Sequence, residues 1–399
     1  MPHAGRKYAA TRNFDRGAGD RSNVSVLSPF LRARSITEEE VLGAVLARHS
    51  PSAAEKFVQE VFWRTYWKGW LESRPLVWTH YRRALAAAYE RLAGERDRAD
   101  LHAKAIEGRT GIVAFDAWAR ELVASGYLHN HARMWFASIW IFTLRLPWEL
   151  GADFFMRHLL CGDPAANTLS WRWVAGLQTK GKTYLATREN IRRYTDGRLD
   201  AGAALATDAR AVEGPTYAAG HLPDLKLELE LRLDEPTLLL LHDDDLGIDT
   251  LALEGLDVRA SLGLCAVRGR SPQTMASGVV TFVHAALGDA LARAPHGDAT
   301  AVIDASDPAA AVTVLVERAR SHGVKRILAP FAPVGPVAEA LAALRAPLHA
   351  RGVGIELLGR RYDATAWPYA TRGFFNLKDK IPTVLAELGI ATRRGGTSS

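Results

Sequence analysis

Residues 1–200 place their hydrophobic positions at the spacing of amphipathic helices, with strong helix formers between them. The spacing predicts helices in three segments: residues 38–50, 53–73 and 81–95. The most apolar stretch, residues 135–144, is interpreted as a buried helix. Thr37 stands before three glutamates and predicts a helix start, while Asp153 predicts the start of another helix that Gly162 ends. The first half of the chain is therefore expected to be helical.

Residues 237–390 have a different pattern, in which short apolar runs alternate with helical segments. Five runs predict strands: TLLLLHDDD, SLGLCAV, TAVID, KRILAP and VGIELLG. Such alternation predicts an open, mostly parallel sheet covered by helices. No G-x-G-x-x-G follows a strand, so the dinucleotide fingerprint is absent. Asp243–Asp245 follow the first strand, where three acids could bind a divalent cation, but we expect a solvated loop.

The stretch between the halves is rich in Gly, Ala and Asp, and we interpret residues 201–236 as a linker. Within it, residues 225–234 alternate apolar and charged positions, which predicts an exposed strand or ribbon. Residues 391–399 are expected to be a flexible tail.

The composition narrows the class of protein. Hydrophobic residues make up 48% of 399 residues, with mean hydropathy of −0.08, which predicts a globular protein of two domains. The longest apolar runs are too short for a membrane span, and the first residues lack the apolar core of a secretory signal. Two distant cysteines argue against a disulfide framework, a four-cysteine zinc site or a cysteine-bound iron–sulfur cluster. We expect a cytoplasmic monomer.

Charge is unevenly distributed. Residues 1–200 hold 30 Lys and Arg against 21 Asp and Glu, whereas the remainder holds 20 against 23. A basic first half indicates a polyanion partner. A basic run at residues 180–193 is equally typical of DNA backbone contact and of a solvated helix face.

The most informative stretch is residues 126–194. It combines His-Asn-x-x-Arg-Met at residues 129–134, Gly-Asp-Pro-Ala-Ala-Asn at residues 162–167 and a Trp-x-Trp pair at residues 171–173. These motifs closely resemble the flavin-binding domain of the DNA photolyase/cryptochrome family. The resemblance implies an all-helical, FAD-binding domain in residues 1–200. Residues 237–390 more weakly resemble the family's Rossmann-like α/β antenna domain, here in swapped order and with no identifiable antenna chromophore.

The resemblance also implies residues that bind FAD. SNVSVLSPFL at residues 22–31 matches the family's phosphate loop, although the residues alone also fit an ordinary capping loop. The implied phosphate contacts are Tyr8, Ser25, Leu27 and Ser28, and the implied contacts near the flavin ring are Arg64, Arg133, Asp163 and Asn167.

A lesion pocket is implied by the same comparison. Its substrate contacts would be Trp63, Asn130, Met134 and Trp173, with Glu60 as a catalytic carboxyl group. The (6-4) photolyases place His at the two positions held here by Asn130 and Met134, so the chain resembles the cyclobutane-dimer type. The alternative for these tryptophans is simple core packing. His129 and His131, two residues apart on a helix, do not form a metal site.

The resemblance also implies a role in electron transfer for three residues. Asn167 would lie beside flavin N5, which favours a repair enzyme, and Trp171 and Trp148 match the proximal and middle members of a tryptophan relay. The distal member is unassigned, with Trp118 and Trp135 as candidates. Cys161 departs from the family, which commonly has an Asp paired with the arginine that Arg133 matches; we expect flavin binding with altered redox behaviour.

Three functions remain open from the sequence. The first is light-driven, FAD-dependent repair of cyclobutane pyrimidine dimers in DNA. The second is a blue-light photoreceptor of the cryptochrome kind, and the third is a relative that keeps the fold and has lost flavin.

Overall fold

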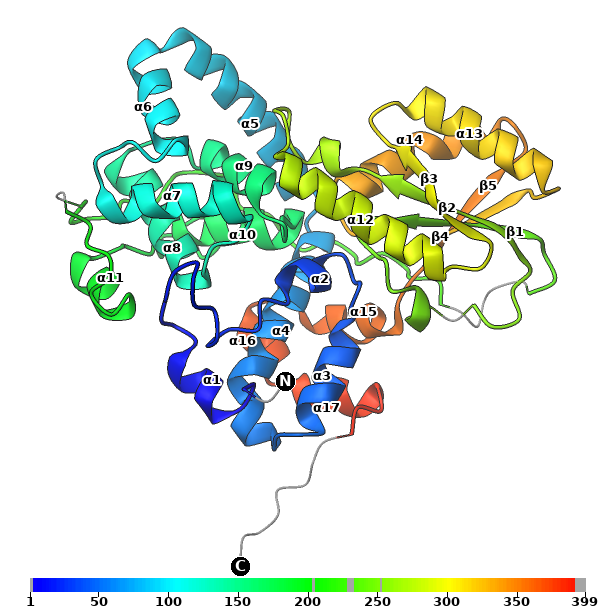
Figure 1. Cartoon of the computed structure of the whole chain (residues 1–399), viewed down its shortest axis with the longest axis horizontal. Coiled ribbons are helices and arrows are strands. Elements are labelled where there is room, and N and C mark those ends of the chain that lie inside the picture. Colours follow the sequence, from blue (N-terminus) through cyan, green and yellow to red (C-terminus); the bar gives the residue numbers. More distant parts are fainter. Residues whose placement is uncertain (1–2, 203–204, 228–232, 252, 392–399) are drawn as a thin grey trace, which may run out of the picture. The chain divides into compact units, whose positions relative to one another are not determined.

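The computed structural model describes residues 3–202, 205–227, 233–251 and 253–391 (Figure 1). The chain forms two compact units, each assembled from separate stretches of sequence. The helical unit comprises residues 1–26, 52–57 and 74–218, and the α/β unit comprises residues 27–51, 58–73 and 219–399. The compact units therefore do not coincide with a division at residue 200.

The helical unit is built around buried aromatic side chains. Phe115 and Phe136 stack with ring centroids 4.1 Å apart, and Phe136 and Trp140 stack at 5.9 Å. The helices of this unit are α1 (Arg6–Thr11), α5 (Leu76–Gly94), α6 (Arg96–Ile106), α7 (Val113–Ser125), α8 (Asn130–Ser138), the π-helical turn η1 (Ile139–Thr143), α9 (Trp148–His158), α10 (Pro164–Val174) and α11 (Arg188–Tyr194).

The predicted helix start at Asp153 is wrong. Helix α9 already begins at Trp148 and ends at His158, so Asp153 lies in its interior, fully buried. Its carboxylate accepts a hydrogen bond from the Tyr89 hydroxyl at 2.7 Å and pairs with Arg157 at 3.2 Å. A carboxylate with two such partners can be buried inside a helix. The presence of an Asp therefore did not mark the start of α9.

The α/β unit contains the predicted parallel sheet. The five strands are β1 (Thr237–His242), β2 (Val258–Cys265), β3 (Gly297–Asp304), β4 (Arg326–Pro330) and β5 (Gly354–Leu358). All neighbouring strands are parallel, in the order β3-β2-β1-β4-β5. β1 is buried along its whole length, which is why its sequence reads as an uninterrupted apolar run.

Helices cover both faces of this sheet. Leu238 and Leu240 of β1 share a core cluster with α13 (Pro308–Ser321) and α14 (Pro336–His349). On the other face, α12 (Ser277–Arg293) packs against β1, β2 and β3. Figure 1 shows α12 apart from α13 and α14. The arrangement confirms the expected α/β sheet.

Early and late segments of the sequence complete the α/β unit. They form α2 (Ser28–Arg32), α3 (Glu38–Leu46), most of α4 (Pro51–Glu72), α15 (Arg361–Ala366), α16 (Phe374–Lys378) and α17 (Ile381–Glu387). Thr37 caps α3 through a capping box with Glu40, as predicted. Gly69 permits α4 to approach the Trp367 side chain closely, because a Cβ at residue 69 would lie 2.8 Å from that ring.

Residues 205–218 of the predicted linker belong to the helical unit and form neither helix nor strand. Thr183 donates a hydrogen bond to the Ala209 carbonyl at 3.2 Å, and Val212 N–H donates to Ala175 at 2.9 Å. Half of the predicted ribbon at residues 225–234 lies outside the described residues, since 228–232 are not among them, and residues 225–227, 233 and 234 form no strand. Residues 392–399 of the predicted tail also lie outside the described residues.

Two further expectations concern membranes and cysteines. Within the described residues, none of the helices combines the length and apolar character needed to cross a bilayer. Cys161 and Cys265 are both buried and unlinked. Burial raises the pKa of the Cys265 thiol to about 12.

Candidate active site

One face of α10 carries three of the predicted site residues. Asp163, Asn167 and Trp171 are spaced by four residues, so they lie on the same side of the helix. Asp163 caps α10 by accepting from the Ala166 N–H at 2.8 Å, and the Asn167 amide donates to the Ala152 carbonyl at 2.8 Å. Both side chains are buried and held in fixed orientations.

Cys161 lies against Arg133, as the sequence predicted. The Arg133 Nη2 is 3.3 Å from the Cys161 Sγ, while its Nε donates to the Leu128 carbonyl at 2.8 Å. A thiol is a weak acceptor and carries no charge when protonated. The guanidinium is therefore not neutralised by this neighbour as it would be by a carboxylate.

Helix α8 brings Asn130, Arg133 and Met134 to one side by their helical spacing. Asn130 is exposed and Met134 is half-buried. His129 and His131, in contrast, bond to backbone carbonyls of residues 12 and 13 at 3.0 and 2.9 Å. Burial lowers the pKa of both, that of His129 to about 4. Both rings therefore have a structural role in holding the segment around residues 12 and 13.

The two tryptophans proposed for electron transfer, Trp171 and Trp148, are both buried and each packs on other aromatic rings. Trp171 is buried, and a Cβ at Gly151 would lie 2.3 Å from its ring, so glycine permits α9 to approach it. Trp148 packs on Tyr81 with centroids 5.5 Å apart, and Tyr81 packs on Trp78 at 5.4 Å.

Two candidates for the distal member of the relay are placed differently. Trp118 and Trp135 stack on each other at 5.4 Å, are fully buried and donate to Asp15 and Asn190, respectively. These contacts account for them as core residues. Tyr81 and Trp78 extend the ring contacts from Trp148 but were not predicted from the sequence. Their spacing of three residues on α5, which places both rings on one side of the helix, was the available signal.

Trp173 also has an aromatic neighbour. Its indole stacks on Tyr184 with centroids 5.6 Å apart and an interplanar angle of 28°. Both side chains are half-buried. Tyr184 stands in the segment that departs from the family pattern, so resemblance alone could not identify it.

The predicted phosphate loop contains a strained residue. Val26 adopts a φ of +53°, a left-handed conformation that a β-branched residue rarely takes. It lies between exposed Ser25 and half-buried Leu27 and Ser28. Strain of this kind costs about 1–3 kcal/mol and is concentrated at functional sites. Tyr8, in the helical unit, packs edge-on against Phe57 at 5.1 Å.

The predicted residues of α4 belong to the α/β unit. Trp63 stacks on Phe374 of α16 with centroids 3.6 Å apart and an interplanar angle of 7°. Arg64 pairs with Glu38, Nε to Oε1, at 3.7 Å, and Glu60 is half-buried. One flat face of Trp63, the ring proposed for stacking a base, is thus covered by another ring of this chain. Phe374 was missed, although the aromatic run at residues 362–375 was a signal.

The structure places the predicted site residues in both units. The helical unit holds Tyr8, Ser25, Asn130, Arg133, Met134, Trp148, Asp163, Asn167, Trp171 and Trp173. The α/β unit holds Leu27, Ser28, Glu60, Trp63 and Arg64.

The expectation of a solvated loop at Asp243–Asp245 is wrong. These three residues are 1%, 6% and 1% exposed. Arg32 pairs with Asp244 at 2.6 Å, and Arg360 pairs with Asp245 at 2.6 Å. The acids are buried because arginines neutralise them. The described residues hold no His, Cys, Asp and Glu group suited to a metal ion.

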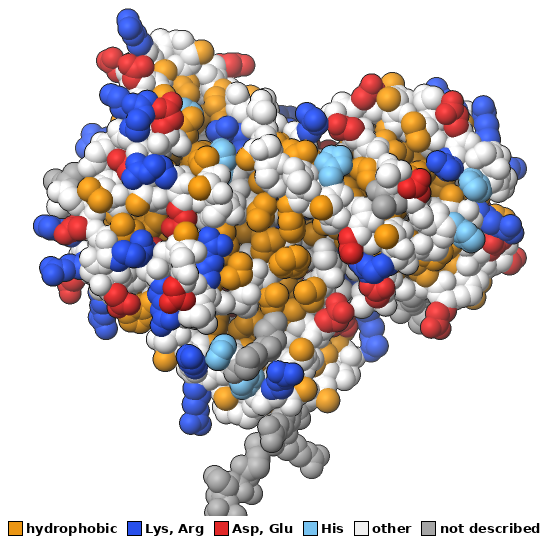
Figure 2. Space-filling model, viewed as in Figure 1, with side chains coloured by type: hydrophobic (Ala, Val, Ile, Leu, Met, Phe, Trp, Pro, Cys, Tyr) orange, Lys and Arg blue, Asp and Glu red, His pale blue; other side chains and the backbone are white. Residues whose placement is uncertain are grey.

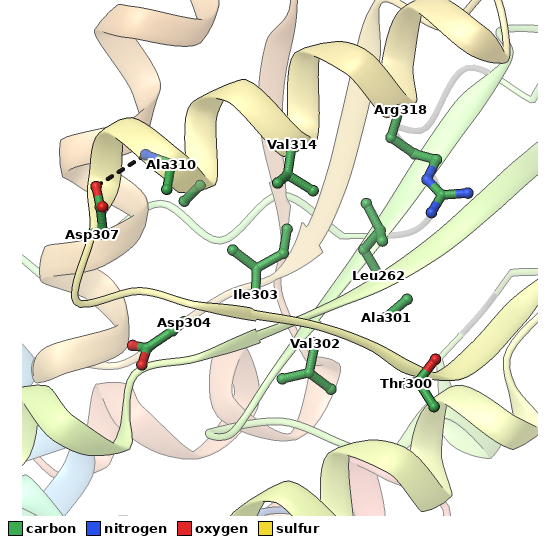
Figure 3. A pocket seen from close by; sticks show the side chains of 11 residues that line it. Leu262, Thr300, Ala301, Val302, Ile303, Asp304, Asp307, Ala310, Val314 and Arg318 are labelled. Carbon is green, nitrogen blue, oxygen red and sulfur yellow. Dashed lines mark hydrogen bonds between the residues drawn. The ribbon is translucent and has the colours of Figure 1, made fainter.

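Surface charge and the surface hollow do not mark the position of the predicted site. Figure 2 shows Lys and Arg side chains scattered over α5–α11 with acidic side chains between them. Arg188, in the basic run, is held by Asp200 through two hydrogen bonds of 2.6 and 2.8 Å. A hollow of about 330 Å³ lies beside β3 and α13 and is mostly apolar (Figure 3). The predicted site residues are not among those that line it.

Comparison with known proteins identifies the helical stretch. Residues 57–196 match the FAD-binding domain of DNA photolyase. This stretch of the chain is therefore similar to the flavin-binding domain of the DNA photolyases. The match supports FAD as the cofactor of this photolyase-like chain.

Two curated relatives are similar to different proportions of the chain. The deoxyribodipyrimidine photo-lyase of Streptomyces griseus is 35% identical over 41% of this chain and 34% of its own length. That of Alkalihalophilus pseudofirmus is 29% identical over 57% of this chain and 43% of its own. The chain thus spans less than half the length of these relatives. A bacterial class III photolyase from Agrobacterium tumefaciens has a TM-score of 0.39, with 26% identity over 48% of this chain and 41% of its own, too low for comparing whole folds.

The residues of the helical unit fit a flavin. Arg133 and Asn167 offer a cation and an amide, both held by hydrogen bonds to backbone carbonyls, as polar groups for such a ligand. Within the described residues, Trp171 Nε1 and Thr168 Oγ1 on α10 are buried without a hydrogen-bond partner. Buried polar atoms of this kind are uncommon in proteins and are consistent with a bound polar group.

Proposed function

We propose that this protein repairs cyclobutane pyrimidine dimers in DNA in a light-driven, FAD-dependent reaction. The observation that carries the proposal is the face of α10, where Asp163, Asn167 and Trp171 are held by the contacts described above. These residues lie within the stretch that matches the photolyase FAD-binding domain. The curated relatives bear the name deoxyribodipyrimidine photo-lyase.

The cofactor would be held by two groups of residues. Tyr8, Ser25, Leu27 and Ser28 would contact the phosphates through hydroxyl and backbone groups. Arg64, Arg133, Asp163 and Asn167 would surround the ring. When bound and reduced, FAD would supply light-driven electron transfer to the dimer.

The remaining site residues would bind and orient the dimer. DNA would bind through phosphate contacts, and the dimer would leave the stack to reach the pocket. Trp63 and Trp173 offer flat rings for stacking, at about 1–3 kcal/mol per base. Asn130 and Met134 offer no proton for transfer, which favours a cyclobutane dimer over a (6-4) lesion. The Glu60 carboxyl group would hold a proton at the thymine edge.

The test is repair of a defined thymine-dimer oligonucleotide by wild type and Glu60→Ala. We expect light-dependent repair by wild type and repair reduced on the order of tenfold or more in the variant, since positioned proton donors contribute at least that much. Photoreduction of the flavin should be unchanged by this substitution. Equal repair by both proteins would contradict the role of Glu60.

A blue-light photoreceptor is the second candidate, and one contact favours it. Phe374 covers Trp63 in a parallel stack at 3.6 Å, so the ring proposed for lesion binding already has a partner. A photoreceptor needs flavin and electron transfer but no lesion pocket. Photoreduction by light without any dimer repair would favour this alternative.

A further inference from the structure

The order of strands reverses between β1 and β4 in the α/β unit, and we call the region outside the carboxyl ends of these two strands the crevice. β1 and β4 are neighbours at the centre, and the chain builds outward from them in opposite directions. Open α/β sheets bind ligands at such a reversal, outside the carboxyl ends of the two strands. Here the crevice is bordered by Asp243–Asp245 after β1 and by residues 331–335 after β4.

The loop after β1 is bound by arginines from the α2 segment of the same unit. Arg32 Nη1 donates to the Asp243 backbone carbonyl and lies 3.2 Å from Asp243 Oδ2, and its Nη2 lies 2.6 Å from Asp244 Oδ1. Arg34 Nη1 lies 3.3 Å from Asp245 Oδ2. Both arginines are 2% exposed. The chain's own side chains therefore occupy the position of a ligand.

The loop after β4 is bound by the α4 segment. Glu72 Oε1 accepts a hydrogen bond from the Val334 N–H at 2.5 Å. Residues 27–51 and 58–73 thus contact both loops that border the crevice.

Two more arginines complete the pairing of the acids. Arg270 lies 2.8 Å from Asp243 Oδ2, and Arg360 donates to both oxygens of Asp245 at 2.6 and 2.8 Å. Burial alone would raise the pKa of Asp243, but Arg32 and Arg270 lower it to about 2. The pKa of Asp245 is also held below its usual range, by Arg360 and Arg34, against the effect of burial. A ligand would have to displace charged groups that are already paired.

The same network reaches residues proposed to bind FAD. Arg34 Nε lies 3.2 Å from Glu38 Oε2, and Glu38 Oε1 lies 3.7 Å from Arg64 Nε. Ser28 and Arg32 are the first and last residues of the same short helix, α2. The loop after β1 therefore fixes the segment that carries Ser28 and contacts Arg64 through Glu38.

We propose that the α/β unit holds the chain's own arginine segment in its sheet crevice, and that Asp243, Asp244 and Asp245 are positioning residues for FAD binding. The inference rests on the proposed cofactor residues Ser28 and Arg64. The unit would then serve at this crevice as a support for the cofactor site, in place of an antenna chromophore site.

Asp244→Asn tests the proposal, because Asp244 contacts Arg32 while Asp243 keeps its other partners. Thr237→Val is the matched control. Thr237 Oγ1 accepts from buried Arg326 Nε at 2.9 Å, at the opposite end of β1, so this variant also deprives a buried arginine of an acceptor. The measurement is the dissociation constant of FAD for the apoprotein, followed by flavin fluorescence, beside the thermal unfolding midpoint of each variant.

We expect Asp244→Asn to weaken FAD binding about tenfold or more, as loss of a hydrogen bond between charged groups predicts. Thr237→Val should stay within about twofold of wild type. Unchanged affinity in a folded Asp244→Asn, or equal weakening in both variants, would overturn the inference. If Asp244→Asn does not fold, Arg32→Lys keeps the charge but loses the two-pronged contact and should weaken binding similarly.

The outcome is separable from that of the repair assay. A wild type that binds FAD but repairs no dimer would contradict the repair proposal, and the affinity comparison would still decide the role of the aspartates. A wild type that binds no FAD would overturn the inference itself.

Discussion

Glu72 is expected to make the stability of this protein fall as pH rises. The side chain is 7% exposed and accepts from the Val334 N–H. Burial raises its pKa from 4.5 to about 8, and the hydrogen bond from Val334 and the nearby Lys68 only partly oppose this. Between these two values the folded state binds a proton that the unfolded state has lost, so the free energy of unfolding decreases with increasing pH.

The magnitude follows from the two pKa values. Each pH unit between them removes about 1.4 kcal/mol, so the loss is about 3 kcal/mol at pH 7 and about 5 kcal/mol above pH 8. The contribution is fully present below pH 4.5, the unfolded value. Glu72→Gln keeps an oxygen for the Val334 N–H and cannot ionise. Its stability relative to wild type should therefore rise from near zero at low pH to about 3 kcal/mol at pH 7.

The assay is urea unfolding of wild type and Glu72→Gln at about four pH values from 5 to 8, followed by circular dichroism. Glu317→Gln, an exposed position on α13, is the control and should change stability equally at every pH. Parallel pH dependence of wild type and Glu72→Gln would refute the reasoning, because the carboxyl group would then titrate alike in both states.

Two further predictions concern the site. Phe374→Ala should uncover one face of Trp63 and raise the affinity for a dimer-containing oligonucleotide severalfold, measured in the dark by fluorescence anisotropy. The control Phe375→Ala, at a 72% exposed position, should leave this affinity unchanged. Lower affinity in a folded Phe374→Ala would contradict the prediction. Cys161→Asp should place a carboxylate on Arg133 and shift the reduction potential of bound flavin to a more negative value, on the order of 60 mV, in a spectroelectrochemical titration. Cys161→Ser, which adds no charge, should leave the potential unchanged, and an equal shift in both would count against the charge argument.

The sequence predicted elements that depend on local pattern. All five strands were recognised because each is a short apolar run between turns, and the parallel sheet follows from the helices between them. The start of α3 was recognised because Thr37 and Glu40 make a reciprocal, local contact. The neighbours Arg133 and Cys161 were paired correctly only through the family resemblance, since 28 residues separate them.

Long-range pairing could not be predicted. Asp243–Asp245 have the composition of a solvated loop, and arginines from other parts of the sequence explain their burial: Arg32 and Arg34, more than 200 residues earlier, and Arg270 and Arg360, which follow. Asp153 looked like a helix cap because its partner Tyr89 is distant in sequence. The stacking of Phe374 on Trp63 was likewise not predicted, because the two residues are far apart in the sequence. In each case a tertiary contact outweighs the preference of the residue type.

Repair of a thymine-dimer oligonucleotide by the reduced, FAD-loaded protein tests the central claim most directly. The product is measured after equal times in blue light and in the dark. Our account predicts that thymines are restored in the light alone. Absence of repair in the light, with flavin bound and photoreducible, would contradict it.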